Sequence, residues 1–483
     1  MKIVFVGRSV YHFTYYESIV RELCKRGHTV KMIYDWNWSK NRPDEALQRC
    51  LGEFRNLSME WGPIRNDRFR PFIFFLRELL SYCSYLSRVS KGEQSEFYLN
   101  RWRHYLPPLV RDKVALPSFK KILKKKMLQD ILRVIEKLTP PAKNIVEFLK
   151  KESPDVVVAS PVNMRFSEEV EYVKAAKLMG IPTVTAVLSW DNLSTKGLFH
   201  IIADLTLVWN WLHFKEAVEI HHVSPKRALI VGAYFFDKWF NTDHFLMNRE
   251  DFCKELNISP YHPFVVYLGS SANIARDETW LVKEIVDSLH TYSNPQIKEM
   301  SVVIRPHPAN AQIYEKIKMP NVVVYPKEGA LPESEISQKY FFNTLYHSLG
   351  TIGINTSGMI DALILNRPCV SIITERYKNT QLRAIHFKYL LQSKALEIIH
   401  TPQEFPQKIE SFLYGEDTKR KYREEFVTTF IRPYGRNISA GEVSACAIEL
   451  MGKRWNAEEV VEKVRNKFLE KKMLRREERV VRS

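Results

Sequence analysis

Two short stretches constrain the fold of this chain more than any other part of its sequence. The stretches 301–304 and 350–354 are runs rich in β-branched residues, and each leads into polar or small residues. A buried strand that delivers polar groups at its carboxyl end has this pattern. In an open α/β sheet, ligands bind at that edge. The residues that follow offer a cation, an imidazole, two hydroxyls and a glycine, a set suited to a diphosphate. They are Arg305, His307, Thr356, Ser357 and Gly358.

The alternation of apolar runs with helical patterns occurs twice along the chain. The first series extends from a predicted strand over 2–7 to one over 228–231, and the second from 264–268 to 369–373. With 483 residues, the chain is also too long for one ordinary core. Each series predicts a doubly wound parallel sheet. The expected fold class is therefore α/β, with two similar halves.

Composition shifts and breaker residues predict the boundaries of these halves. We expect a first domain over 1–237, a linker over 238–261, a second domain over 262–436, a closing helix over 437–452 and a basic helical tail over 453–483. Aromatic residues and arginines mix over about 36–114, which we interpret as irregular helices inserted in the first domain. These helices would line a cleft or touch lipid headgroups. The alternative is ordinary core packing with arginines that bury their stems.

The charge and the cysteines limit the partners and the compartment. The net charge of +17 favours an anionic partner, either nucleic acid, an acidic membrane or a phosphorylated substrate. Six scattered cysteines without zinc-site spacing predict free thiols in a reducing compartment. The sequence shows neither a signal peptide nor an apolar run long enough to span a bilayer. We expect a cytoplasmic protein, and attachment to the inner face of the plasma membrane stays open.

The tail over 453–483 is the segment that could make such an attachment. It is rich in lysine and arginine, and Val461, Val464 and Phe468 recur at helical spacing. A helix of this kind can lie on an anionic membrane. The alternative is a solvated helix that packs along one thin apolar stripe.

Further polar residues follow other predicted strands. His12 follows the strand over 2–7, and Asp191 follows the strand over 182–188. A neutral imidazole or a carboxylate beside Trp190 could act as a general base. A structural loop role for His12 and an Asx turn for Asp191 are the simpler interpretations. In the second half, Ser270 and Ser271 follow the strand over 264–268.

Several motifs resemble those of the GT-B glycosyltransferase superfamily. Arg305-Pro-His-Pro308 resembles the His-Pro signature of bacterial sialyltransferases, capsular Kdo transferases and CDP-glycerol glycerophosphotransferases. Thr356-Ser-Gly-Met-Ile-Asp361 is similar to the Ser-Ser-x-x-x-Asp that follows in the last two groups. Asn366-Arg-Pro368 and the segment 209–237 also look like superfamily features. The resemblance covers about 2–448 except 36–114, and it implies two Rossmann-like domains that face each other across a cleft.

This resemblance implies a glycosyltransferase that moves a sugar from a nucleotide-activated donor to a surface glycan or lipid-linked acceptor. The sequence contains no Asp-x-Asp, so we expect no catalytic metal and no cofactor besides the donor. Protein groups would then stabilise the leaving group, and Glu375 could bind ribose hydroxyls. The donor-binding residues would be Ser270, Ser271, Arg305, His307, Thr356, Ser357, Gly358 and Glu375, and Asp191 or His12 would be the base.

Three other functions compete with this interpretation. A CDP-glycerol or ribitol-type phosphotransferase on the same fold is favoured by the Ser/Asp spacing. A UDP-GlcNAc 2-epimerase is disfavoured because its paired glutamates are absent and the aromatic insert is present. A non-enzymatic, nucleic-acid-binding protein is indicated by charge alone. Because the basic residues form no known binding motif, we expect no nucleic-acid partner.

Overall fold

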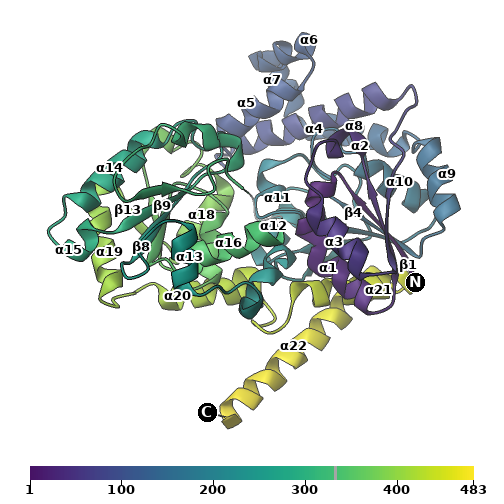
Figure 1. The fold of residues 1–483 in the computed structure, drawn as a ribbon. Coiled ribbons are helices and arrows are strands. Elements are labelled where there is room, and N and C mark those ends of the chain that lie inside the picture. Colours follow the sequence, from purple (N-terminus) through teal and green to yellow (C-terminus); the bar gives the residue numbers. More distant parts are fainter. Residues whose placement is uncertain (331–333, 483) are drawn as a thin grey trace. The chain divides into compact units, whose positions relative to one another are not determined.

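A computed structural model describes residues 1–330 and 334–482, with side chains through residue 473 (Figure 1). The chain divides into two compact units. Unit 1 comprises Met1–Asp237 and Thr429–Ser483, and unit 2 comprises Lys238–Thr428. The C-terminal segment thus returns to the first unit after the second is complete.

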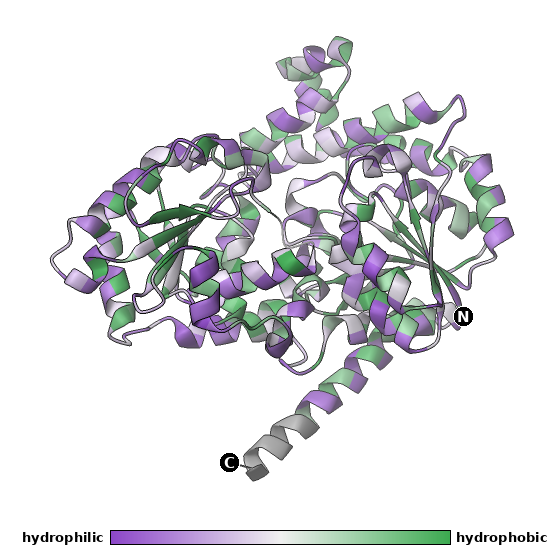
Figure 2. Cartoon of the chain, viewed as in Figure 1, coloured by the Kyte–Doolittle hydropathy of each residue, from purple (hydrophilic) through white to green (hydrophobic). Residues whose placement is uncertain are grey.

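Unit 1 contains a parallel sheet of seven strands in the order β3-β2-β1-β4-β5-β6-β7. The strands are β1 (Lys2–Gly7), β2 (Thr29–Tyr34), β3 (Leu57–Trp61), β4 (Val156–Ser160), β5 (Thr183–Ala186), β6 (Leu205–Val208) and β7 (Ala228–Ile230). Every residue of β4, β5 and β6 is buried, as expected for strands that are covered on both faces. Green strands in Figure 2 show these apolar runs in the middle of the unit.

The strand order of unit 1 reverses beside β1. The chain places β2 and β3 on one side of β1 and then crosses to β4 on the other side, where Gly7 pairs with Ser160. The loops after β1 and β4 therefore diverge to opposite faces of the sheet at its carboxyl edge. Such a switch point is the usual ligand-binding crevice of an open parallel sheet.

Helices and turns connect these strands. The helices of unit 1 are α1 (Phe13–Lys25), α2 (Trp36–Ser39), α3 (Glu45–Glu53), α4 (Arg70–Ser90), α5 (Glu96–Tyr105), α6 (Pro108–Arg111), α7 (Pro117–Leu123), α8 (Lys126–Leu138), α9 (Lys143–Glu152), α10 (Glu169–Leu178), α11 (Asn192–Thr195), α12 (Trp211–Glu219), α21 (Ala440–Gly452) and α22 (Ala457–Arg482), with the 3-10 turns η1 (Val10–His12), η2 (Lys113–Ala115) and η3 (Pro225–Arg227).

The predicted insert over 36–114 is wrong in one respect, because β3 lies within it and forms the edge of the sheet. The sequence Leu-Ser-Met-Glu-Trp of β3 is half polar, and only Leu57 in it is buried, so it gives a weak strand pattern. The helices of this segment pack by aromatic and aliphatic side chains together. Tyr82, Tyr85 and Trp102 belong to one buried cluster, which matches the core-packing alternative.

One predicted helix is two helices in the structure. We expected a single helix over 118–138, but α7 ends at Leu123 and α8 begins at Lys126. Lys125 has an extended backbone between them. Three successive lysines at 124–126 repel one another, yet neither glycine nor proline marks the break.

A buried network of charges joins α4 and α8 to α10. Arg77 of α4 contacts Glu136 of α8 at 2.8 Å and also pairs with Glu171 of α10. Arg65 pairs with the second oxygen of Glu171 at 2.9 Å, and Lys174 lies 3.4 Å from Glu136. All five side chains are buried. Removing one member would leave an unpaired buried charge, so the network stabilises the packing of these helices only while it is complete.

Unit 2 contains a parallel sheet of six strands in the order β10-β9-β8-β11-β12-β13. The strands are β8 (Phe264–Leu268), β9 (Ser301–Arg305), β10 (Val322–Val324), β11 (Gly350–Gly353), β12 (Cys369–Ile372) and β13 (Glu397–Ile399). The order reverses beside β8, as it does beside β1 in unit 1. The edge strand β13 was not predicted, because three residues give too short a pattern.

The remaining elements of unit 2 are helices and 3-10 turns. They are α13 (Arg249–Glu255), α14 (Thr279–His290), α15 (Pro295–Lys298), α16 (Glu335–Tyr346), α17 (Gly358–Ile364), α18 (Ile385–Gln392), α19 (Phe405–Leu413) and α20 (Arg420–Phe426), with η5 (Thr242–His244), η6 (Pro308–Tyr314), η7 (Glu375–Tyr377) and η8 (Pro402–Glu404). The turn η4 (Tyr234–Phe240) and the π-helical η9 (Val427–Ile431) stand where the chain passes between the units. Thus η5 and α13 occupy part of the predicted linker over 238–261.

The C-terminal segment completes the packing of unit 1. The carboxylate of Asp237 accepts hydrogen bonds from the amides of Ala440 and Gly441 at 3.1 and 2.8 Å, and it pairs with Arg432 at 2.7 Å. In α22, Val464 and Phe468 are fully buried. The described part of the tail therefore follows the packed-stripe alternative, and its membrane contact stays a prediction. No helix among the described residues is long and apolar enough to cross a bilayer.

Candidate functional site

The predicted donor-binding residues lie along the carboxyl edge of the unit 2 sheet. Strand β8 pairs with both β9 and β11, with Leu268 opposite Arg305 on one side and Gly353 on the other. The loops after these three strands therefore meet. A Cβ atom on Gly269 would lie 3.0 Å from the carbonyl oxygen of Arg305, so the two loops approach as closely as only glycine permits.

Arg305 is buried at the end of β9, with 4% of its surface exposed. One nitrogen donates to the carbonyl of Ala330 at 3.3 Å, and the guanidinium stacks over the ring of Phe341 at 4.7 Å. Its Nε and Nη1 are buried and have no hydrogen-bond partner. Burial lowers the pKa of Arg305 to about 10. The side chain remains a cation at neutral pH, and no carboxylate of the described residues forms an ion pair with it.

His307 stands two residues later, partly exposed. Its Nδ1 accepts the amide hydrogen of Ala309 at 3.1 Å and thus caps η6. Burial lowers the pKa of His307, so the ring is neutral at pH 7. Because Nδ1 is an acceptor, Nε2 carries the proton and can donate to a ligand. Gly329, at φ +70°, lies so close that a Cβ atom there would be 2.9 Å from the nitrogen of Pro308.

The residues after β11 form the start of helix α17. Thr356 Oγ1 accepts the amide hydrogen of Gly358 at 3.4 Å, and Ser357 is the N-cap residue of α17. The hydroxyl of Ser357 makes no capping hydrogen bond and is exposed. Thr356 therefore serves partly as a cap, whereas Ser357 has its hydroxyl available for a ligand.

Ser270 and Ser271 differ in their environments. Ser270 is fully buried, its amide donates to Glu278 at 2.6 Å, and its Oγ has no partner. Glu278 also accepts from Tyr267 and Tyr314 at 2.9 and 2.6 Å. The buried carboxylate of Glu278 thus holds the backbone of this loop at Ser270, while the next residue, Ser271, is partly exposed.

Glu375 follows β12 on the same edge but is largely exposed, and it pairs with Lys378 on its own turn. No hydrogen bond or ion pair joins it to the other predicted residues, all of which lie in the described part of the chain. Within the range that the structure describes, no group of His, Cys, Asp or Glu side chains is arranged to hold a metal ion. The predicted roles of all these residues stay predictions.

In unit 1, the two predicted base residues lie at the carboxyl edge, after β1 and β5. His12 is buried in η1, and its Nδ1 has no hydrogen-bond partner. Burial, together with the charges of Arg8, Arg42 and Lys196, lowers the pKa of His12 to about 3. The ring is therefore neutral at pH 7 but weakly basic.

Asp191 is engaged by its own loop. Its carboxylate accepts from the hydroxyls of Ser189 and Thr195 at 2.7 and 2.8 Å, and it pairs with Lys196 at 3.1 Å. It is also the N-cap residue of α11. These contacts hold the carboxylate within its own loop, although its side chain caps no backbone amide of α11, and Asp191 is partly exposed.

Sequence reasoning missed a buried cluster beside the switch point of unit 1. Glu78 of α4 accepts the amide hydrogen of Phe166 at 3.2 Å, and its second oxygen is buried without a partner. Glu169 accepts from the hydroxyl of Ser167. Burial raises the pKa of both carboxyls to about 7. Arg8, at the end of β1, attracts both and has an unpartnered Nη1. The sequence signal that could have indicated this cluster is the occurrence of two adjacent charged residues, Arg77 and Glu78, within a largely apolar helix.

Comparison with known proteins adds to this geometry. No protein-family model and no curated protein matches the sequence. A putative UDP-N-acetylglucosamine 2-epimerase from Listeria monocytogenes matches with a TM-score of 0.55 and 9% identity, over 95% of this chain and 98% of its own. The UDP-GlcNAc 2-epimerase of Neisseria meningitidis, bound to UDP-GlcNAc, matches with a TM-score of 0.50 and 12% identity, over 94% of this chain and 100% of its own. The chain has the GT-B fold. Its two Rossmann-like sheets are those that the sequence predicted.

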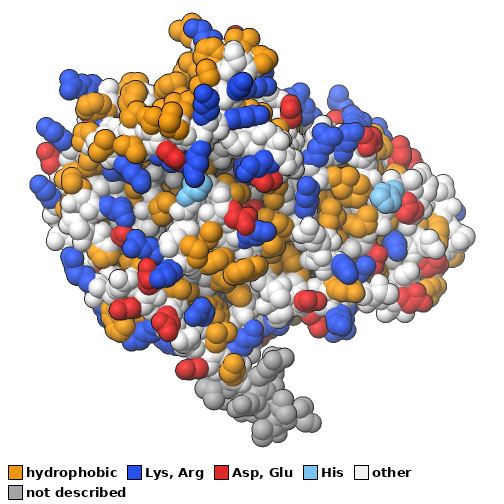
Figure 3. All heavy atoms as spheres, turned by 180° about the vertical axis from the view of Figure 1, so that it is seen from behind, with side chains coloured by type: hydrophobic (Ala, Val, Ile, Leu, Met, Phe, Trp, Pro, Cys, Tyr) orange, Lys and Arg blue, Asp and Glu red, His pale blue; other side chains and the backbone are white. Residues whose placement is uncertain are grey.

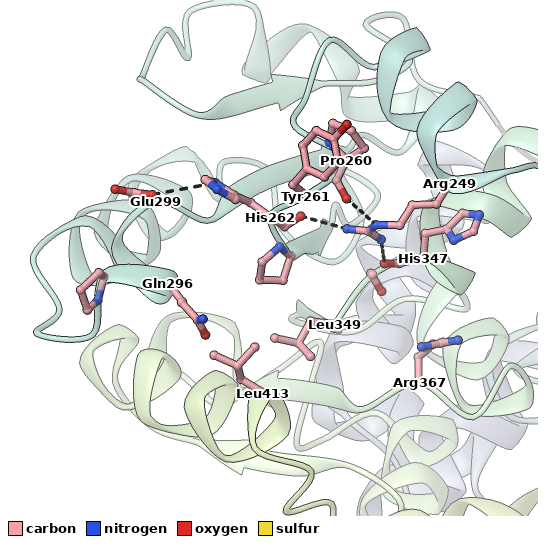
Figure 4. A pocket seen from close by; sticks show the side chains of 13 residues that line it. Arg249, Pro260, Tyr261, His262, Gln296, Glu299, His347, Leu349, Arg367 and Leu413 are labelled. Carbon is pink, nitrogen blue, oxygen red and sulfur yellow. Dashed lines mark hydrogen bonds and ion pairs between the residues drawn. The ribbon is translucent and has the colours of Figure 1, made fainter.

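Unit 2 of this GT-B chain also has a cavity of about 590 Å³ at the opposite, amino-terminal edge of its sheet. It is lined by residues that precede the strands, among them His262, Leu349 and Arg367 (Figure 4). Arg249 donates three hydrogen bonds there, to the carbonyl oxygens of Pro260, His262 and His347. The cavity is thus at the other end of the sheet from the loops described above, and the guanidinium of Arg249 is already hydrogen-bonded within the protein.

Asp361 is a second residue whose environment the sequence did not reveal. It is buried in α17 and accepts the indole hydrogen of Trp239 at 2.6 Å. Burial raises its pKa from 3.8 to about 6, against the attraction of Lys238 and Arg305. Since the folded state holds this proton more tightly than the unfolded state, ionisation between about pH 4 and pH 6 costs folding free energy.

Asp361→Asn should therefore leave stability unchanged near pH 4 and raise it at pH 8 by on the order of 1–3 kcal/mol. The amide oxygen can still accept from Trp239. Urea unfolding of both proteins across this pH range measures the difference. Asp277→Asn is the matched control with the opposite sign, because hydrogen bonds from Thr279 lower the pKa of Asp277. A gain that is equal at pH 4 and pH 8 would exclude the titration of Asp361 as its cause.

Proposed function

We propose that this chain is a metal-independent glycosyltransferase of the GT-B type. It takes a sugar from a nucleotide-activated donor and transfers it to a surface glycan or a lipid-linked acceptor at the inner face of the plasma membrane. Unit 2 would bind the donor, and unit 1 would supply the acceptor site and the base. The motif Arg305-Pro-His-Pro308 favours the group of bacterial surface-polysaccharide transferases.

The observation that carries this proposal is the buried guanidinium of Arg305. A buried cation with two unbonded nitrogens is unfavourable unless an anion accepts hydrogen bonds from those nitrogens and balances the charge. It stands at the end of β9, the strand beside β8, on the carboxyl edge of a Rossmann-like sheet, where ligands bind. A diphosphate supplies both the negative charge and paired oxygens for the planar fork of arginine.

The neighbouring groups suit a departing nucleoside diphosphate or monophosphate. His307 can donate from Nε2, and Thr356 and Ser357 offer hydroxyls on the adjoining loop. Donors that are held in place before the reaction stabilise charge as it develops on the leaving oxygen. Neutral and cationic protein groups would thus do the work that a metal does in other transferases.

The base would come from the carboxyl edge of unit 1. Asp191 and His12 remain the predicted candidates, and we add Glu78 as a third. A general base works best when its pKa is near the operating pH. The pKa of about 7 for Glu78 meets this condition, whereas the pKa of about 3 for His12 does not.

One observation favours a second function, sugar-nucleotide epimerisation. Glu78 and Glu169 are two buried carboxyls with raised pKa values beside Arg8. Such a pair can remove and return a proton, which epimerisation at a carbon requires. The solved structures named above are of UDP-GlcNAc 2-epimerases. Incubation of UDP-GlcNAc with the chain in heavy water, without acceptor, tests this: deuterium at C2 indicates epimerisation.

Arg305→Met should weaken the binding of a nucleoside diphosphate by about 10- to 100-fold, since a charge-assisted hydrogen bond is lost. The same variant should keep or raise its melting temperature, because an unpaired buried charge is removed. Calorimetric titration with UDP and CDP and thermal unfolding measure the two effects. A prior thermal-shift screen with UDP-sugars, CMP-sugars, CDP-glycerol and single-stranded DNA selects the ligand and separates the phosphotransferase alternative.

Arg420→Met is the matched control, because Arg420 is an exposed arginine of the same unit. It should leave nucleotide affinity unchanged. If Arg305→Met bound the nucleotide with wild-type affinity, the assignment of Arg305 as the anion site would be wrong. If His307→Ala did so, His307 would not belong to that site. Stabilisation by single-stranded DNA alone would end the enzyme proposal.

If Glu78 is the base, Glu78→Gln should lower kcat by about 10²- to 10⁴-fold for transfer or slow hydrolysis of the selected sugar nucleotide. The rate of the wild-type chain should then fall below about pH 7, as the carboxylate takes up a proton. The pH profiles of wild type, Asp191→Asn and His12→Asn identify the base, with the exposed Glu147→Gln as control. Turnover that survives all three substitutions would show that the base lies elsewhere.

A further inference from the structure

The segment 109–138 of unit 1 exposes more large apolar side chains than packing explains. Leu109, Met127 and Leu138 expose 85%, 72% and 77% of their surfaces. The exposed apolar residues of this segment, which we call the α7–α8 face, are Leu109, Leu116, Phe119, Ile122, Met127, Ile131, Val134, Ile135 and Leu138. Soluble monomers rarely expose contiguous apolar surface of this kind without using it.

The helical geometry of α8 shows that this surface is separate from its packing face. Five exposed residues, Met127, Ile131, Val134, Ile135 and Leu138, fall within an arc of about 100° at 100° per residue. The inward arc is different, and it carries Leu128 and Leu132, which pack on the clusters of α4, and the buried Glu136. The residues of the outward apolar arc thus belong to neither of the core clusters on which α8 packs.

Basic residues surround this face. Residues 109–138 contain nine Lys and Arg against three Asp and Glu, and one of the three, Glu136, is buried in the ion network. None of Lys113, Lys120, Lys121, Lys124, Lys125, Lys126 and Lys137 forms an ion pair with any described residue. Figure 3 shows orange apolar and blue basic side chains interspersed over the upper part of unit 1.

We propose that the α7–α8 face docks on the surface of an anionic lipid bilayer. The apolar side chains would enter the boundary between headgroups and acyl chains, and the lysines would lie among the phosphates. A helix with one apolar arc and a lysine-rich flank has the composition of an interfacial helix. Each lysine near an anionic surface adds to the attraction, and salt weakens it.

The charge of the face decides between this partner and others. A second copy of the chain would bring the same excess of lysines to the contact, so self-association would be repulsive. Nucleic acid would satisfy the lysines but would leave the apolar arc in water. An anionic bilayer satisfies both. This proposal goes beyond the proposed reaction, and its test reads no activity.

Co-sedimentation of the full chain with vesicles tests the proposal. Wild type should bind vesicles of phosphatidylcholine mixed with phosphatidylglycerol more tightly than vesicles of phosphatidylcholine alone, and less tightly as salt is raised. The double variant Ile131→Glu, Leu138→Glu should weaken this binding by about tenfold or more. The triple variant Lys121→Gln, Lys124→Gln, Lys125→Gln should lose the preference for the anionic lipid. Leu178→Glu is the matched control, because Leu178 is a leucine on α10 whose exposure lies between those of Ile131 and Leu138.

Because the substituted side chains are exposed, the variants should keep the melting temperature of the wild type. Unchanged vesicle binding in both the double and the triple variant would overturn the proposal and assign the binding to another segment, such as the basic tail. Absence of wild-type binding to the anionic vesicles would also overturn it. So would a lipid-free dimer of wild type that the double variant abolishes, because the face would then be an interface between copies.

Discussion

Arg305 carries a positive charge inside unit 2 with two of its nitrogens unbonded, and the chemistry proposed for the chain depends on it. Asp361 attracts this cation but forms no ion pair with it, and a buried charge without a paired counterion costs free energy. Folding nevertheless retains it at the carboxyl end of β9, beside β8. Glycine at 269 and at 329 lets the neighbouring loops close around it. The site therefore has a cation, donors and little solvent before any ligand arrives, which is the condition for stabilising a leaving diphosphate.

The sequence predicted the two sheets because their strands are continuous apolar runs, buried on both faces and bounded by polar loops. The sequence-based prediction failed at the edge strands of the sheets and at one break between two helices. Strand β3 is half exposed and alternates weakly, β13 has three residues, and the break between α7 and α8 has no glycine or proline to mark it. Patterns of burial are visible in a sequence, whereas an edge strand is defined by the neighbour that it pairs with.

The candidate site divides in the same way. Arg305, His307, Thr356 and Ser357 were predictable because each follows a strong strand, and parallel strands bring their carboxyl ends together. Glu78 was not predictable, and Asp361 was found only as part of a motif, because what distinguishes both is burial by residues distant in the sequence. Phe166 and Trp239 supply their hydrogen bonds from other elements. The exposed arc of α8 was missed for the related reason that an apolar residue in a helix is assumed to face the core.

The most direct measurement is a structure of the chain with UDP or another nucleoside diphosphate bound. The predicted result is a phosphate oxygen within hydrogen-bonding distance of Arg305 Nε or Nη1, with His307 Nε2 donating to the same diphosphate. A nucleotide bound elsewhere, with Arg305 still unbonded or bonded only to water, would contradict the central claim.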